Sequence, residues 1–194
     1  MKATNSIGAR VGATMLGLAL GTAAWADNPR VRIETSAGNF VVQLEPERAP
    51  LSVQNFLQYA RDGFYEDTIF QRVVSGFVIQ GGGYTADLSP KTPRPAIPNE
   101  SGNGLINRRG TIAMARTGEP HSADAQFYIN LADNLVLDPK PTRWGYAVFG
   151  EVVEGMDVVD EIGHQATAPR EQMQDVPLKP VVIRKVVVLS GAAQ

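Results

Sequence analysis

The sequence predicts a mainly β domain, in the form of a closed antiparallel barrel with helices covering its ends. Short apolar runs recur between turn-rich stretches, and most of these runs are too short to be helices. Only two segments have the apolar spacing of a helix. The first and last segments that follow the N-terminal leader are both strand-like, which favours a sheet that closes on itself. A β-sandwich is the alternative.

The chain begins with the pattern of an export signal. Lys2 and Arg10 precede an uncharged run of about 14 residues, 11–24, which is shorter than the roughly 20 residues that a membrane-spanning helix needs. Small residues at Ala24 and Ala26 suit a signal peptidase. We therefore expect residues 1–26 to be a cleaved signal peptide and residues 27–194 to be a single domain. An uncleaved membrane anchor is the alternative.

The domain opens with a predicted hairpin and a predicted helix. Residues 31–35 and 40–44 have extended patterns, and the turn residues 36–39 separate them. Residues 50–61 place Val, Phe, Leu and Ala at helical spacing, with proline in the first turn and glycine just beyond the end. These segments predict a strand pair followed by an amphipathic helix.

The rest of the chain alternates between short strands and loops. A second helix is expected at 156–162, where Gly163 would end it, and the proline-rich stretch 84–107 is expected to be a long ordered loop on one face of the barrel. The further strands are expected at 69–74, 77–80, 110–115, 126–131, 146–150 and 181–189.

Charge and composition exclude several classes of function. Without the two leader cations, 16 basic residues remain against 20 acidic ones, a formal charge of −4. This balance disfavours a nucleic-acid partner, which would require clustered cations. The chain has no cysteine, so disulfides, zinc thiolates, cysteine nucleophiles and a lipid-modified cysteine are all excluded.

The motifs of familiar catalytic sites are also missing. A nucleophile activated by a base would need a positioned histidine, but His121 and His164, the two histidines of the chain, both have loop contexts. No cluster of potential ligands has metal spacing, and residues 81–83 lack the rest of a phosphate-binding motif. Rotation of an X-Pro amide remains possible, because it needs neither a nucleophile nor a metal.

Three ordered blocks then resemble one family. FQRVVSGFVIQGGG at 70–83 resembles a pattern of an aromatic residue, His, Arg, two apolar residues, a turn, and Phe-Met-x-Gln-Gly-Gly. GTIAMAR at 110–116 leads into SADAQFYI at 122–129, and GYAVFGEVVEGM at 145–156 resembles a strand-to-helix passage. The chain is thereby similar to the cyclophilin-type peptidyl-prolyl cis/trans isomerases along essentially all of residues 27–194, and closest to their bacterial periplasmic branch.

The resemblance implies an eight-stranded barrel capped by two helices, isomerase activity and no cofactor or metal. It also implies that Arg72 is the catalytic arginine, which favours a pyramidal prolyl nitrogen, and that Gln80 orients that arginine and the substrate. A groove for the preceding peptide would include Ala115, Arg116 and Gln126. The pocket for the proline ring would be formed by Phe77, Val78, Tyr128 and Leu137.

Several positions depart from the family pattern. Gln71 replaces a histidine, Val78 a methionine, Tyr128 a phenylalanine and Arg116 an asparagine. Tyr128 adds a hydroxyl to an apolar pocket, where it is expected to shift the preference for the residue before proline.

Two more departures lie where many eukaryotic members have a tryptophan and a histidine. This chain has Val136 and Tyr146 there, and Trp144 is out of register. Because that tryptophan contacts the inhibitor cyclosporin, we expect weak cyclosporin binding. Tyr146 can still donate a hydrogen bond to a substrate.

The prediction is therefore an isomerase that acts on proline-containing, unfolded or flexible polypeptides in the periplasm and assists the folding of exported proteins. It would be a monomer with no nucleic-acid partner and no stable membrane insertion after cleavage. Two alternatives remain: a chaperone domain that holds peptides without turning them over, and a structural barrel that has lost the activity. Arg72 distinguishes the isomerase from a holding domain, because a holding domain needs the apolar pocket but not this cation.

Overall fold

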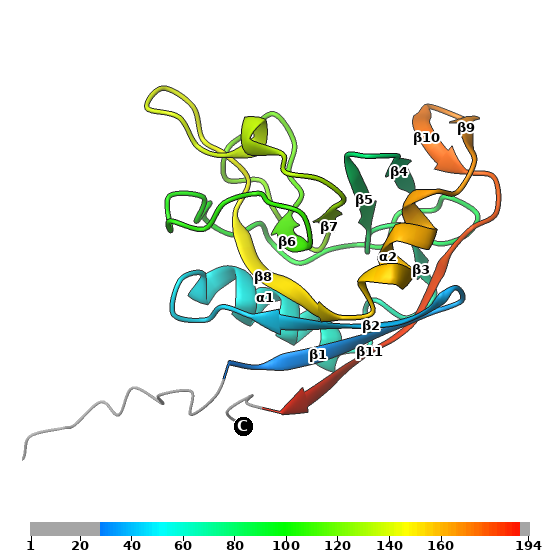
Figure 1. The fold of residues 1–194 in the computed structure, drawn as a ribbon, viewed down its shortest axis with the longest axis horizontal. Coiled ribbons are helices and arrows are strands. Elements are labelled where there is room, and N and C mark those ends of the chain that lie inside the picture. The colour runs from blue at the N-terminus through cyan, green and yellow to red at the C-terminus, as the bar shows by residue number, and fades with distance from the viewer. Residues whose placement is uncertain (1–27, 191–194) are drawn as a thin grey trace, which may run out of the picture.

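A computed structural model of the chain describes residues 28–190 (Figure 1). The predicted signal peptide at 1–26 lies outside the described residues. Among residues 28–190, no helix has the length and apolar character needed to cross a membrane.

The domain is built on one curled antiparallel sheet. Its nine strands are β1 (Arg30–Thr35), β2 (Gly38–Leu44), β3 (Thr68–Ile69), β4 (Arg72–Val74), β5 (Val78–Gly81), β6 (Thr111–Met114), β7 (Phe127–Asn130), β8 (Val148–Glu154) and β11 (Val182–Ser190). They pair in the order β3-β11-β1-β2-β8-β6-β7-β5-β4. A single sheet of this kind supports the barrel prediction over the sandwich.

The two edges of the sheet meet where the chain passes from β3 to β4. Phe70 and Gln71 separate these strands, so the run expected at 69–74 is divided in two and the count becomes nine instead of eight. Ile69 also donates its amide to the carbonyl of Tyr84, at 2.8 Å, and accepts from the amide of Gly82, at 3.3 Å. β3 and β4 do not pair with each other, so the sheet is a curled half-barrel and not the closed eight-stranded barrel that was expected. The chain itself and the bonds of Ile69 bridge the gap between its edges.

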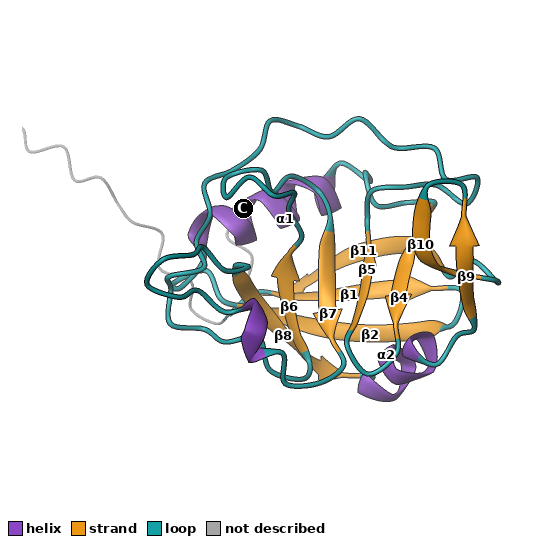
Figure 2. Cartoon of the chain, turned by 90° about the horizontal axis from the view of Figure 1, so that it is seen from above, coloured by secondary structure: helices purple, strands orange, loops and turns teal. Residues whose placement is uncertain are grey.

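Two strands were not expected from the sequence. β9 (Thr167–Arg170) and β10 (Met173–Pro177) form a separate two-stranded hairpin. The hairpin lies beside β4 at one end of the curled sheet (Figure 2). It therefore borders the strand that begins with Arg72.

Two helices lie at opposite sides of the sheet (Figure 2), as predicted. α1 (Pro50–Arg61) turns Val53, Phe56 and Leu57 inward, because their spacing places them on one face. α2 (Met156–Gly163) follows Gly155, whose φ of 76° is left-handed. A β-carbon there would lie 2.6 Å from the carbonyl oxygen of Asn39, so glycine fits both the turn and the contact with β2.

Aromatic rings fill the barrel interior. The ring of Phe56 on α1 lies 5.2 Å from Tyr65, 5.5 Å from Phe127 and 5.4 Å from Phe149, measured between centroids. All four residues are buried, and rings at these separations add specific contacts to the burial of apolar area. The core thus fixes β7 and β8 against α1 and leaves the outer face of the strands for other uses.

The stretch 84–107 is a long ordered loop, as predicted. Its Lys91 donates to the carbonyl of Phe64 at 2.6 Å, and the amide of Arg94 donates to the hydroxyl of Tyr59, also at 2.6 Å. Glu100 caps α1, since its carboxylate accepts hydrogen bonds from the amides of Leu51 and Ser52. These contacts hold the loop against the helix.

Candidate active site

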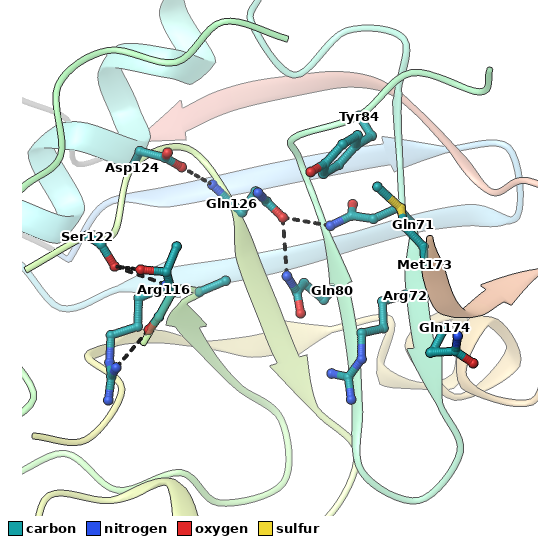
Figure 3. Close-up of a pocket in the computed structure, with 12 residues that line it drawn as sticks. Gln71, Arg72, Gln80, Tyr84, Arg116, Ser122, Asp124, Gln126, Met173 and Gln174 are labelled. Atoms are coloured by element: carbon teal, nitrogen blue, oxygen red, sulfur yellow. Dashed lines mark hydrogen bonds between the residues drawn. The ribbon is translucent and has the colours of Figure 1, made fainter. Parts of the chain in front are cut away.

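A groove crosses the outer face of β4, β5, β7 and β6, and it contains two adjoining cavities. One has a volume of about 100 Å³ and the other of about 330 Å³. Figure 3 shows the residues that line the larger one. Arg72, Gln80, Ala115 and Arg116 line both cavities. The groove is therefore one continuous feature, with these four residues at the junction.

The groove brings together every site residue predicted from the sequence. The larger cavity adds Gln126 to the four residues at the junction. The smaller cavity adds five predicted residues, which are Phe77, Val78, Tyr128, Leu137 and Tyr146.

Strand pairing explains how distant residues reach this face. Arg72 on β4 lies opposite Gln80 on β5, and Gln80 lies opposite Tyr128 on β7. Directly paired residues project from the same face of a sheet. The three side chains therefore form one row across the groove, although Tyr128 follows Arg72 by more than fifty positions in the chain.

Most of the residues that line the smaller cavity are apolar or aromatic. Val78, Ala115 and Tyr128 belong to a small apolar cluster separate from the barrel core, with Leu137 and Tyr146 packed against it. Leu137 comes from a single 3-10 turn, Leu135–Leu137, which the sequence did not predict. Since the walls are packed before any ligand arrives, the cavity is a preformed site for a small apolar ring.

From the sequence we expected the hydroxyl of Tyr128 to lie on the groove surface, but it is hydrogen-bonded to a buried side chain. It donates a hydrogen bond of 2.6 Å to Oδ1 of Asn107, a fully buried residue. Burial raises the pKa of the Tyr128 hydroxyl well above its ordinary value of 10, so it remains a donor. The expectation that this hydroxyl shifts substrate preference is not supported by its position, because Asn107 already engages it.

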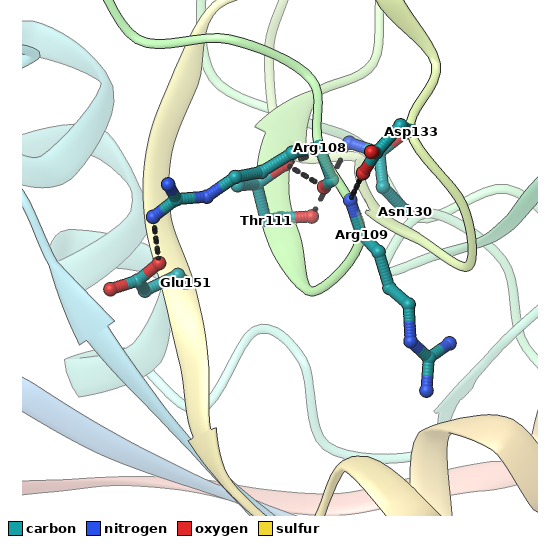
Figure 4. A network of polar contacts seen from close by, with 6 residues as sticks. All are labelled: Arg108, Arg109, Thr111, Asn130, Asp133 and Glu151. Atoms are coloured by element: carbon teal, nitrogen blue, oxygen red, sulfur yellow. Dashed lines mark hydrogen bonds and ion pairs between the residues drawn. The ribbon is translucent and has the colours of Figure 1, made fainter.

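The residues that follow Asn107 are anchored to β8 and to the end of β7 (Figure 4). The guanidinium of Arg108 pairs with Glu151 on β8 at 2.7 Å. The amide of Arg109 donates to Asp133 at 2.9 Å, and Asn130 donates to the hydroxyl of Thr111, also at 2.9 Å. Asn107 is thus held in place by β7, β8 and the turn after β7.

Arg116 ties two segments together at the edge of the groove. Its Nε donates to the carbonyl of Gly145 at 3.1 Å and its Nη2 to that of Trp144 at 2.9 Å. The guanidinium carbon lies 4.5 Å from the ring centroid of Tyr146, a cation–π distance. The arginine that replaces the family's asparagine therefore fixes the wall formed by Tyr146.

Three glutamine side chains form a fixed cluster in the larger cavity (Figure 3). Oε1 of Gln126 accepts hydrogen bonds from Gln71 at 2.7 Å and from Gln80 at 3.2 Å. The amide nitrogen of Gln126 is then the group left to donate to a carbonyl in the groove. Gln71 is 3% exposed, and its Oε1 has no hydrogen-bond partner within residues 28–190.

Arg72 is contacted by a residue that sequence analysis did not identify. Its Nε lies 3.7 Å from Oδ2 of Asp175 on β10. Met173 and Gln174 of the same strand line the larger cavity. The stretch 167–177 contains two prolines and lacks apolar alternation, so no sequence signal indicated a hairpin beside the site.

Neither histidine lies on the groove. Nδ1 of His121 accepts from the amide of Asn99 at 3.0 Å, and its ring lies 5.0 Å from that of Trp144. His164 follows the last residue of α2. Between residues 28 and 190, no three His, Asp or Glu side chains lie close enough together to hold a metal ion.

Comparisons with known proteins agree with this geometry. Residues 30–188 match the family model described as "Cyclophilin type peptidyl-prolyl cis-trans isomerase/CLD". The chain is 50% identical over 161 residues to peptidyl-prolyl cis-trans isomerase B of Escherichia coli K12, covering 81% of this chain and 98% of the relative. It is 51% identical over 154 residues to isomerase A of Dickeya dadantii, covering 79% and 81%.

Solved structures show the same fold. A cyclophilin type isomerase of Cryptosporidium parvum superposes with a TM-score of 0.68 at 25% identity, covering 84% of this chain and 98% of that one. A second structure of that protein, determined in the presence of the dipeptide Ala-Pro, superposes with a TM-score of 0.67.

Proposed function

The chain belongs to the cyclophilin-type peptidyl-prolyl cis-trans isomerases, and from this premise we propose that it accelerates the rotation of X-Pro bonds in exported polypeptides while they fold. The isomerase activity follows from the family. The folding role and the exported clients are our own proposal, supported by the export pattern at the start of the sequence.

The observation that carries the proposal is the position of Arg72 at the junction of the two cavities. Rotation of an X-Pro amide has a barrier of about 18–20 kcal/mol, and it takes about 10–100 s without a catalyst. The smaller cavity would hold the pyrrolidine ring, and the larger one would hold the residues before proline. Arg72 then lies beside the amide that rotates.

The groove supplies a cavity that excludes water and a guanidinium that can donate a hydrogen bond, which are the two features that such a rotation needs. An apolar cavity removes water from around the ring, which strengthens a hydrogen bond from the guanidinium. A bond that favours a pyramidal nitrogen stabilises the twisted amide more than the planar one, and each tenfold acceleration needs about 1.36 kcal/mol of this difference. No covalent intermediate is required.

The first experiment measures the cis-to-trans relaxation of a short Ala-Pro peptide with the purified protein and with Arg72→Ala. Arg32→Ala is a matched control, since Arg32 is a strand arginine with the same 39% exposure and one carboxylate partner. We expect acceleration by the wild type and the control, and loss of most of it in Arg72→Ala. If the wild type binds the peptide without accelerating its relaxation, the result would support the alternative of a chaperone domain that holds peptides without turning them over.

Export and location form a separate part of the proposal. We expect the mature protein to begin at Asp27 and to be recovered in the periplasmic fraction. Mass spectrometry of the intact protein after cell fractionation tests both points. An unprocessed N-terminus in the membrane fraction would favour the anchored alternative.

Weak cyclosporin binding is supported by the residue that precedes Leu137, a wall of the smaller cavity. Val136, at the position of the family's tryptophan, is 61% exposed and offers far less surface than an indole ring. Trp144 lies nearby in the chain, but it packs against His121. Titration of the isomerase activity with cyclosporin tests this, and potent inhibition would contradict it.

A further inference from the structure

The side chain of Arg72 has a single polar partner among residues 28–190, the carboxylate of Asp175, whose Oδ2 lies 3.7 Å from Nε of Arg72. No hydrogen bond within this part of the chain engages the two terminal nitrogens of the guanidinium. Since Arg72 lines both cavities, these nitrogens are available to a peptide in the groove. Asp175 therefore contacts the guanidinium at Nε and leaves its two terminal nitrogens free for a substrate.

The backbone around Asp175 is shaped for this contact. Its φ is 58°, in the left-handed region, which aspartate tolerates better than most residues with a side chain. The β9–β10 register shifts between Met173 and Val176, so Asp175 lies in a bulge. Bulges re-aim side chains, and this one presents a carboxylate to the neighbouring β4.

The residue expected to orient Arg72 is engaged elsewhere. Gln80 lies opposite Arg72 in the β4–β5 pair, but its amide donates to Gln126. The orienting contact to Arg72 thus comes from β10 and not from β5. On this basis we propose that Asp175 is a positioning residue that fixes the Arg72 guanidinium for catalysis. The inference rests on the isomerase function proposed above.

A nearby carboxylate has two opposing effects on a catalytic cation. It restricts the orientation of the guanidinium, which favours catalysis, and it reduces the positive potential at the substrate, which opposes it. Both side chains are about two-fifths exposed, 39% for Arg72 and 42% for Asp175. Water screens the effect on the more distant substrate more strongly than the direct contact at Nε, so the orienting effect is the larger one.

The test compares Asp175→Asn with Glu171→Gln. Asparagine keeps the shape and tolerates the left-handed backbone, so the bulge is preserved and only the charge is lost. Glu171 lies on the same hairpin with a φ of 55°, and it pairs with no cation in the described chain, so its variant controls for loss of charge. We expect kcat to fall about two- to fivefold in Asp175→Asn, as for an exposed ion pair, with KM unchanged and only a small fall in Tm.

Two further measurements distinguish positioning from a general structural effect. The NMR signal of the Arg72 Nε–H group is expected to shift toward that of a solvated arginine in Asp175→Asn but not in Glu171→Gln. The kcat difference between wild type and Asp175→Asn should also shrink as salt is added, because salt screens the lost attraction.

Unchanged or increased kcat in Asp175→Asn would overturn the inference, as would an equal loss in Glu171→Gln or an unmoved Arg72 signal. An inactive wild type would instead overturn the proposed function. The NMR signal separates these cases, because it reports the Arg72–Asp175 contact whether or not the peptide isomerises.

Discussion

The hydroxyl of Tyr128 donates a 2.6 Å hydrogen bond to Oδ1 of Asn107, and both side chains are buried beneath the smaller cavity. Asn107 in turn donates to Asp138 from its backbone amide and from its side chain, at 2.8 Å each. Asp138 follows directly after Leu137, a wall of the cavity. The floor and one wall of the smaller cavity are therefore connected through Asn107.

This connection predicts that Tyr128→Phe lowers stability and leaves activity nearly unchanged. Loss of one buried hydrogen bond should reduce the free energy of unfolding by about 0.5–1.5 kcal/mol. The loss stays in this range because Asn130 still donates to Asn107 Oδ1 at 3.3 Å. The ring that faces the pocket is retained, so kcat/KM should change less than about twofold.

Urea unfolding and the peptide assay check this prediction, with Tyr84→Phe as the control. The Tyr84 side chain lines the larger cavity, and its hydroxyl makes no hydrogen bond within residues 28–190, so its loss should not affect stability. A large change in kcat/KM for Tyr128→Phe would mean that the hydroxyl reaches the substrate after all.

Gly83→Ala should weaken substrate binding. A β-carbon at Gly83 would lie 2.5 Å from Cγ and 2.7 Å from Cδ of Gln126, closer than atoms can approach. Gln126 must then move, which breaks its hydrogen bonds with Gln71 and Gln80. We expect KM to rise about three- to tenfold, equivalent to the loss of roughly one hydrogen bond.

The matched control is Gly102→Ala, where a β-carbon meets no atom within 4 Å and the backbone is not left-handed. Steady-state kinetics of both variants should show a raised KM in Gly83→Ala only. If Gly83→Ala keeps the wild-type KM, the position of Gln126 does not limit peptide binding.

The fold was predictable where apolar periodicity is strong. The helix expected at 50–61 is α1, Pro50–Arg61, because its buried face is marked by regular spacing. The strand expected at 146–150 is β8, Val148–Glu154, which begins two residues later and extends four residues further, through the partly exposed residues 151–154. The hairpin β9–β10 was missed, because a bulge and two prolines remove the alternation that identifies a strand.

The site was predictable as a set of residues but not as a set of contacts. The motif resemblance identified ten residues, and all of them line the groove. The partners that hold them were not identified, because Asn107 and Asp175 are distant in sequence and reach the site through tertiary packing. Gln71 was noted as a departure, but its bond to Gln126 depends on the pairing of β4, β5 and β7.

The stability of the domain should depend on the contact between Glu100, in the loop 84–107, and the start of α1. Both carboxylate oxygens accept hydrogen bonds there, from the amide of Leu51 at 3.0 Å and from the amide and hydroxyl of Ser52 at 2.8 and 2.7 Å. Ala49, at the usual capping position, provides no side-chain cap. Glu100→Ala should therefore lower the free energy of unfolding by about 1–2 kcal/mol.

Chemical denaturation of Glu100→Ala and of Glu47→Ala measures this effect. Glu47 is an exposed glutamate just before the same helix, and it caps nothing in the described structure. Equal stability of the two variants would show that water replaces the Glu100 cap without loss.

The ion pair between Arg109 and Asp160 should make stability depend on pH. Two parallel hydrogen bonds of 2.8 and 2.7 Å join the guanidinium to the carboxylate, and they connect α2 to the segment before β6. The hydrogen bond from Arg109 lowers the pKa of Asp160 below its ordinary value of 3.8. A carboxyl whose pKa is lower in the folded state adds stability above its unfolded pKa and loses it as pH falls through the folded value.

Asp160→Asn is accordingly expected to be less stable than the wild type at about pH 7, by roughly 0.2–1 kcal/mol for a partly exposed pair, with the difference shrinking as pH falls below the ordinary pKa of the carboxyl. Urea unfolding across this range measures it. Glu161→Gln, which removes the adjacent exposed carboxylate of α2, should show no such pH-dependent difference. A difference in Asp160→Asn that persists at low pH would instead indicate that asparagine disturbs the packing of α2, because the protonated carboxyl no longer pairs with Arg109.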